Sequence, residues 1–72
     1  MEKVKIHTEY IKLQQALKLA GLVGQGADVK AYIAEGLVTV NGQAVSERGK
    51  KLRHGDVAEI KGIGKAEIVQ EE

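Results

Sequence analysis

The side chains best suited to chemistry lie in one short stretch, SERGKKLRHGD, at residues 46–56. This stretch places four cations within six positions: Arg48, Lys50, Lys51 and Arg53. Guanidinium and ammonium groups form charge-assisted hydrogen bonds to phosphate oxygens. We therefore interpret the stretch as a binding surface for a polyanion. The alternative is a solvated surface on which the cations cluster by chance.

The charge of the chain is polarised along its length, although its net charge is only +1. Residues 12–55 carry seven Lys and Arg side chains against three Asp and Glu, whereas residues 56–72 carry two against five. The middle of the chain is therefore net +4, and its C-terminal end is net −3. Polarity of this kind can orient a domain on a polyanion.

Catalytic and metal chemistry have little support in the sequence. The chain lacks Cys, and its two His, His7 and His54, are far apart. Neither has the partner that general acid–base catalysis or metal binding needs at usable spacing. The glycines of residues 21–26 follow G-x-x-G-x-G rather than G-x-G-x-x-G, and Ala66 stands where a phosphate loop has Ser or Thr after its Gly-Lys pair. We therefore expect no enzyme, no cofactor, no metal and no small-molecule substrate.

The length of 72 residues predicts one domain, residues 1–72, with a marginal core. That core must be aliphatic, because the chain has two Tyr and neither Phe nor Trp. The N-terminus has no apolar run or cleavage-site pattern, and no stretch approaches the ~20 apolar residues of a membrane span. Together with the absence of Cys, these features predict a cytoplasmic protein that does not enter a membrane. We also expect a monomer.

The elements that must position the cations are organised around residues 27–45. Val29, Tyr32 and Ile33 share one helical stripe, which predicts a helix over residues 27–35 that ends at Gly36. A strand over residues 38–40 follows directly, and Asn41-Gly42 then predicts a type I′ hairpin turn with positive φ at both positions.

The remaining elements are shorter. Alternation predicts strands over residues 3–7, 57–60 and 66–69, and apolar residues at i, i+3, i+4 and i+7 predict a helix over residues 13–20. Tyr10 and Ile11 fit either the start of that helix or an extension of the first strand.

Two further positions bear on the basic surface. Leu52 is the only apolar residue of the basic stretch and should enter the core, which sends Lys51 and Arg53 outward together. On the second helix, we expect Ala31 to face the first helix and Lys30 to point into a groove shared by the two.

The order of these parts resembles that of the S4 domain, an RNA-binding module, over residues 10–70. The residues that carry the resemblance are Lys12-Leu13, Leu17, Val29-Lys30, Ile33, Gly36, Val38, Val40-Asn41-Gly42 and the run from Leu52 to Val57. More narrowly, the GKKL-x-x-GD stretch at residues 49–56 resembles that of small stand-alone bacterial proteins of the YaaA type. The resemblance implies an α+β fold, with two short packed helices against a small, bent, mostly antiparallel sheet.

The resemblance also implies the binding site and its ligand. The residues that it points to are Lys12, Lys18, Lys30, Asn41, Arg48, Lys50, Lys51 and Arg53. The implied ligand is structured RNA, ribosomal RNA or transfer RNA, with the ribosome as a further partner. Gln25 and Gly26 stand where many members have Ser-Arg, so one phosphate contact and a strong helix cap are expected to be missing.

A scarcity of aromatic side chains disfavours stacking of single-stranded bases, which leaves phosphates and shape as the recognised features. The alternative function is a protein-interaction module that uses a sheet edge or the alanine-rich helix face of Ala27, Ala31 and Ala34.

Overall fold

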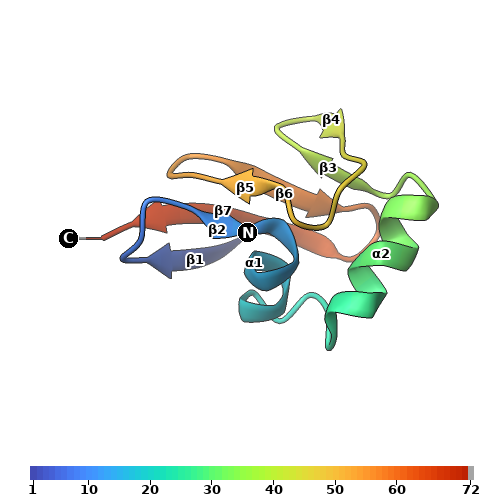
Figure 1. The fold of residues 1–72 in the computed structure, drawn as a ribbon, viewed down its shortest axis with the longest axis horizontal. Coiled ribbons are helices and arrows are strands. Elements are labelled where there is room, and N and C mark those ends of the chain that lie inside the picture. The colour runs from blue at the N-terminus through green and yellow to red at the C-terminus, as the bar shows by residue number, and fades with distance from the viewer. Residues whose placement is uncertain (72) are drawn as a thin grey trace.

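The computed structural model describes residues 1–71, and in it two helices lie on one side of a five-stranded sheet (Figure 1). The helices are α1 (Leu13–Leu19) and α2 (Gly26–Ala34). The strands are β1 (Glu2–Ile6), β2 (Ile11–Lys12), β3 (Val38–Val40), β4 (Gln43–Ala44), β5 (Lys51–Leu52), β6 (Val57–Ile60) and β7 (Gly64–Gln70). The α+β class inferred from the sequence is confirmed.

The main sheet has the strand order β1-β7-β6-β3-β4. Three of its four pairings are antiparallel, and the fourth, β1 with β7, is parallel. Strands β2 and β5 form a separate two-stranded antiparallel ladder. The open question about Tyr10 and Ile11 is thereby answered: Ile11 begins a short strand of its own, directly before α1.

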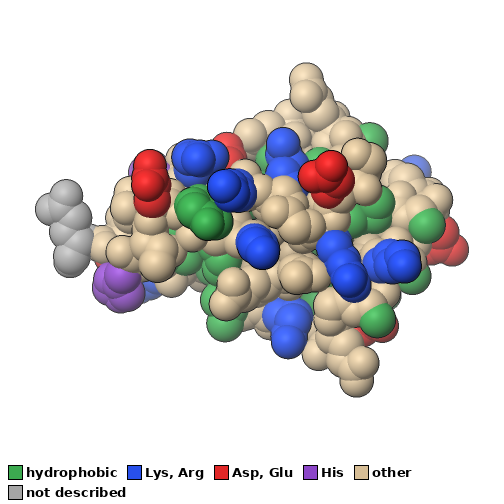
Figure 2. All heavy atoms as spheres, in the orientation of Figure 1, with side chains coloured by type: hydrophobic (Ala, Val, Ile, Leu, Met, Phe, Trp, Pro, Cys, Tyr) green, Lys and Arg blue, Asp and Glu red, His purple; other side chains and the backbone are tan. Residues whose placement is uncertain are grey.

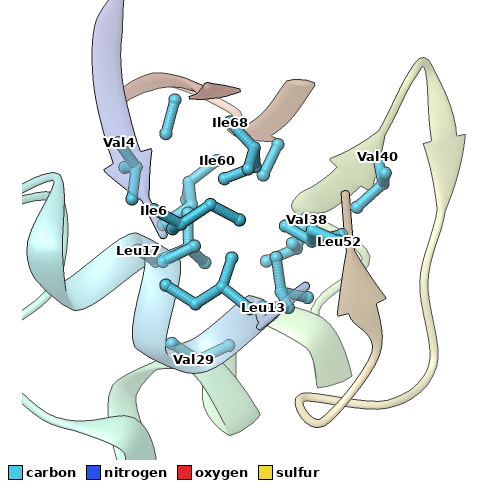
Figure 3. Close-up of a cluster of buried hydrophobic side chains, with 14 residues drawn as sticks. Val4, Ile6, Leu13, Leu17, Val29, Val38, Val40, Leu52, Ile60 and Ile68 are labelled. Carbon is cyan, nitrogen blue, oxygen red and sulfur yellow. The ribbon is translucent and has the colours of Figure 1, made fainter. Parts of the chain in front are cut away.

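The core is aliphatic, as the composition requires, and it joins both sheets to both helices. Alternate strand residues such as Val4, Ile60 and Ile68 point toward α1, which contributes Leu17 (Figure 3). Leu52 is fully buried, which confirms that it carries the basic stretch into the core. The two-stranded ladder is therefore held to the main body by apolar packing.

Helix α2 packs less deeply than its stripe predicts. Val29 is fully buried, but Tyr32 and Ile33 are only half-buried. The expectation that Ala31 faces the first helix is wrong, since Ala31 is exposed. Gly26 faces α1 instead: a Cβ at this position would come within 3.3 Å of Gln14 Oε1.

The start of α2 is better capped than the sequence suggests. The Asp28 carboxylate accepts a hydrogen bond from the backbone N–H of Gln25 (3.2 Å), and a carboxylate here also interacts favourably with the helix dipole. The expectation of a weak cap is therefore wrong in part.

The hairpin has the predicted turn. Asn41 has φ +52° and Gly42 has φ +84°, so both central residues are left-handed, as type I′ requires. Beyond β4, the Val45 N–H still donates to the Val38 carbonyl (3.3 Å). No helix among the described residues is long and apolar enough to cross a bilayer.

Candidate nucleic-acid interface

The loop of residues 45–50, between β4 and β5, is fastened to the start of α1 by its backbone. The N–H of Leu13 donates to the carbonyl of Lys50 (2.8 Å), and the N–H of Gln14 donates to the carbonyl of Arg48 (3.0 Å). The first N–H groups of a helix have no partner within it, and here the loop supplies two. The backbone at Arg48 and Lys50 is consequently held beside the start of α1.

The β2–β5 ladder places two cations, Lys51 and Arg53, close to one aromatic ring. Its inward residues, Ile11 and Leu52, pair with each other and are buried. On the outward side Lys12 pairs with Lys51, and Tyr10 and Arg53 occupy the next positions of the same register. Lys51 Nζ lies 4.7 Å from the centre of the Tyr10 ring, and Arg53 Cζ lies 5.9 Å from it.

Two shallow hollows bring the helix cations to the same region. Lys30 and Arg48 line a hollow of about 340 Å³ between α2 and the loop. Lys18 lines a second hollow, of about 300 Å³, with Gln14, Gln15 and the first residue of α2. Lys30 therefore lines the hollow beside the loop, and Lys18 lines the separate hollow between the two helices.

Lys50 and Asn41 differ from the other expected site residues. The Lys50 side chain lines a hollow on the hairpin side of the loop, with Val40 and Glu47. The Asn41 amide is already engaged: its Nδ2 donates to Asp56 Oδ1 (3.0 Å), and its Oδ1 accepts from the N–H of Val57 (2.9 Å). These two hydrogen bonds join the hairpin tip to the turn after β5.

The remaining six cations, which we call the basic face, are all exposed. They are Lys12, Lys18, Lys30, Arg48, Lys51 and Arg53. Figure 2 shows Lys and Arg side chains gathered over β5, α1 and α2, with only isolated acidic groups among them. Like charges that gather on one surface repel, so folding stability does not account for this arrangement.

The outer side of the main sheet has a different character. Lys3 lies opposite Glu67, and Lys65 lies opposite Glu59, in the strand register. Both lysines, and Lys5 on the same side of β1, alternate with buried residues, so they point away from the helices. This mixed surface provides lysines that are suitable controls for the basic face.

Three residues of the region were not singled out as contacts from the sequence. The Tyr10 ring lies beneath the ammonium group of Lys51, and Gln14 and Gln15 line the hollows on the α1 side. In the sequence, a tyrosine two positions from a lysine is only a weak signal of a binding site. Only the long-range pairing of β2 with β5 shows that cations gather around this tyrosine.

Comparison with known proteins gives matches over almost the whole chain. A family model described as S4 domain matches residues 4–69. A curated protein of Bacillus subtilis (strain 168), named "Probable ribosome maturation protein RlbA", is 42% identical over 66 residues, which cover 92% of this chain and 93% of that protein.

Proposed function

The chain belongs to the S4 domain family, and from that premise we propose that it binds structured RNA through the basic face. Ribosomal RNA is the proposed first target and transfer RNA the second. The Bacillus subtilis relative is named as a ribosome maturation protein, which supports a ribosomal target and a cytoplasmic location. We propose that the chain acts as a monomer and by binding alone, without catalysis.

The observation that carries this proposal is the attachment of the loop to α1. Because the carbonyls of Arg48 and Lys50 bond the first N–H groups of α1, the backbone positions that carry cations distant in sequence are fixed relative to one another. A preorganised row of cations binds a phosphate backbone without first being ordered, so less conformational entropy is lost on binding. Lys50 adds a cation at the hairpin margin of this row. Asn41 supports the site by holding the hairpin in place.

The mode of binding follows from the shape of the surface. The hollows are shallow and open, and Lys30, Arg48 and Lys18 are among the residues that line them. Such a surface suits the ridge of a folded RNA backbone, since double-stranded RNA is recognised mostly by shape, phosphates and 2′-hydroxyls. Affinity therefore depends on phosphate neutralisation and falls with salt.

Charge reversal on each part of the basic face tests the proposal. The variant Arg48→Glu with Lys51→Glu should lose binding to ribosomal RNA and transfer RNA transcripts in a filter-binding assay. The matched control, Lys5→Glu with Lys65→Glu, changes the net charge equally on the outer side of the sheet and should bind almost as wild type. Equal loss in both variants would show that net charge alone, and no particular surface, determines binding.

One observation favours the alternative of a protein-interaction module. Ala27, Ala31 and Ala34 are all exposed, so α2 presents a low surface on which another backbone could rest. Under this alternative, a protein partner recovered with the wild-type chain would also be recovered with the charge-reversed variant. Under the RNA proposal, such a partner is lost when the extract is treated with ribonuclease.

A further inference from the structure

The outward side of the β2–β5 ladder combines a pair of like charges with an exposed aromatic ring, which contacts to phosphates alone do not require. Lys12 and Lys51 lie directly opposite each other, although like charges in a cross-strand pair destabilise a sheet. Beside them stands Tyr10, 37% exposed, with Lys51 Nζ 4.7 Å from its ring centre. An exposed aromatic ring within a group of cations is the combination that binds unpaired nucleotides, because a base can stack while its phosphate is neutralised.

A hollow opens directly beside this ring. It has a volume of about 530 Å³ and is lined by Thr8, Tyr10, Ile11, Lys12, Gln14 and Gln15. Its lining combines an aromatic residue, Tyr10, with two residues that carry side-chain amides, Gln14 and Gln15. Side-chain amides both donate and accept hydrogen bonds, and therefore suit the edge of a nucleobase.

The ring is held in place by the backbone around it. The Thr8 hydroxyl donates to the Tyr10 carbonyl (2.8 Å), and Ile11, the next residue, is buried and paired with Leu52. The hollow is thus bounded by a pinned turn on one side and by the first turn of α1 on the other. A preformed site of this kind loses little entropy when a base enters it.

We propose that this hollow receives one unpaired nucleobase, which stacks on Tyr10 while its edge meets the amides of Gln14 and Gln15. The cations Lys12, Lys51 and Arg53 neutralise the flanking phosphates. This inference rests on the proposed function and narrows it. The preferred ligand is a folded RNA with a bulged or extruded nucleotide, rather than an uninterrupted duplex. The scarcity of aromatic residues limits the site to a single base.

The test compares two RNA hairpins that differ by one bulged nucleotide, a 2-aminopurine. Wild-type protein should bind the bulged hairpin more tightly, and the fluorescence of the 2-aminopurine should change on binding as the base enters the hollow. Tyr10→Leu should weaken binding of the bulged hairpin roughly 5- to 150-fold, the range for loss of one stacked base. Its affinity for the uninterrupted hairpin should fall far less, so that the preference for the bulged hairpin is lost.

A conservative variant separates stacking from a merely structural role of the ring. Tyr10→Phe keeps the aromatic face and should keep the preference for the bulged hairpin. Circular dichroism melts of both variants establish that the fold is intact, as the exposure of Tyr10 leads us to expect.

The possible failures are distinguishable. Equal binding of the two hairpins by wild type, or a preference that survives in Tyr10→Leu, would overturn the base-binding hollow and leave the proposed RNA binding in place. If neither hairpin nor any ribosomal or transfer RNA transcript binds, the proposed function fails as well.

Discussion

The hydrogen bonds of Asn41 predict that this residue stabilises the fold rather than contacts RNA. Its amide bonds the Asp56 carboxylate and the N–H of Val57 at 3.0 and 2.9 Å. Asp56 in turn accepts from the N–H of Arg53 at 2.8 Å. Through these bonds Asn41 joins the hairpin tip to the turn that follows β5.

The variant Asn41→Gly isolates this contribution, because glycine accepts the φ of +52° without strain. A net hydrogen bond contributes about 0.5–1.5 kcal/mol, and one to a charged group about 1.5–3 kcal/mol. Water replaces part of each bond because Asn41 is exposed, so we expect a loss of about 2–3 kcal/mol in unfolding free energy, including the entropy of glycine. Asn41→Ala should lose about 1 kcal/mol more, since alanine is strained in the left-handed region.

The assay is a thermal melt by far-ultraviolet circular dichroism, with RNA affinity measured well below the melting midpoint. For a domain of this size, a loss of 2–3 kcal/mol lowers Tm by roughly 8–24 °C. Affinity of the folded protein should stay within about twofold of wild type, less than the loss of up to about tenfold that a direct hydrogen bond to RNA would produce. An unchanged Tm together with weakened RNA binding would refute this reasoning.

Three further predictions concern packing, the turn and the charge pair. Leu17→Ala should lower the free energy of unfolding by about 2–5 kcal/mol. Ile33→Ala should lower it less, because Leu17 is fully buried and Ile33 only half-buried. Urea denaturation of both variants checks this order. Gly42→Val should lower Tm. A Cβ at this position would meet no neighbouring atom, but its φ of +84° is a conformation that a β-branched residue resists. Gly49→Val, also open but without positive φ, is the control, and equal melts would contradict the turn assignment. Lys12→Gln should raise stability by about 0.2–1 kcal/mol by relieving its like-charge pair and should weaken RNA binding; a destabilised variant would show that the pair is not repulsive.

The parts of the fold that follow from local chemistry could be predicted from the sequence. Asn41 and Gly42 occupy the left-handed region because a two-residue hairpin requires it. Leu52 enters the core because it is the only apolar residue in a strongly basic stretch. In both cases the residue type determines the local structure with no knowledge of distant partners.

Other features depend on pairings between distant segments, which local patterns do not encode. Alternation predicted a first strand, but nothing in it indicates that β1 runs parallel to β7. The predicted orientation of Ala31 was wrong, because α2 approaches α1 through Gly26 and Val29. The rotation of a helix about its own axis is weakly determined by its sequence when the helix contains several alanines.

Part of the candidate site could likewise be predicted from the sequence, and part of it could not. Its cations could be identified by type and density, and the relation to the S4 family supplied the helix lysines. The hydrogen bonds of Asn41 could not be foreseen, because its partners Asp56 and Val57 follow it by a whole loop and strand. Tyr10 remained ambiguous for the same reason: its neighbours Lys51 and Arg53 come to it only through the β2–β5 ladder.

The salt dependence of RNA affinity tests the central claim, that cations distant in sequence act together on one phosphate backbone. If about five phosphates are neutralised, the logarithm of affinity should fall with the logarithm of salt concentration with a slope of about −3 to −5. The variant Arg48→Gln with Lys51→Gln should make the slope shallower by about 2, one unit for each lost contact, whereas Lys5→Gln with Lys65→Gln should leave it unchanged. A wild-type slope near zero, or equal slopes for the two double variants, would contradict the account.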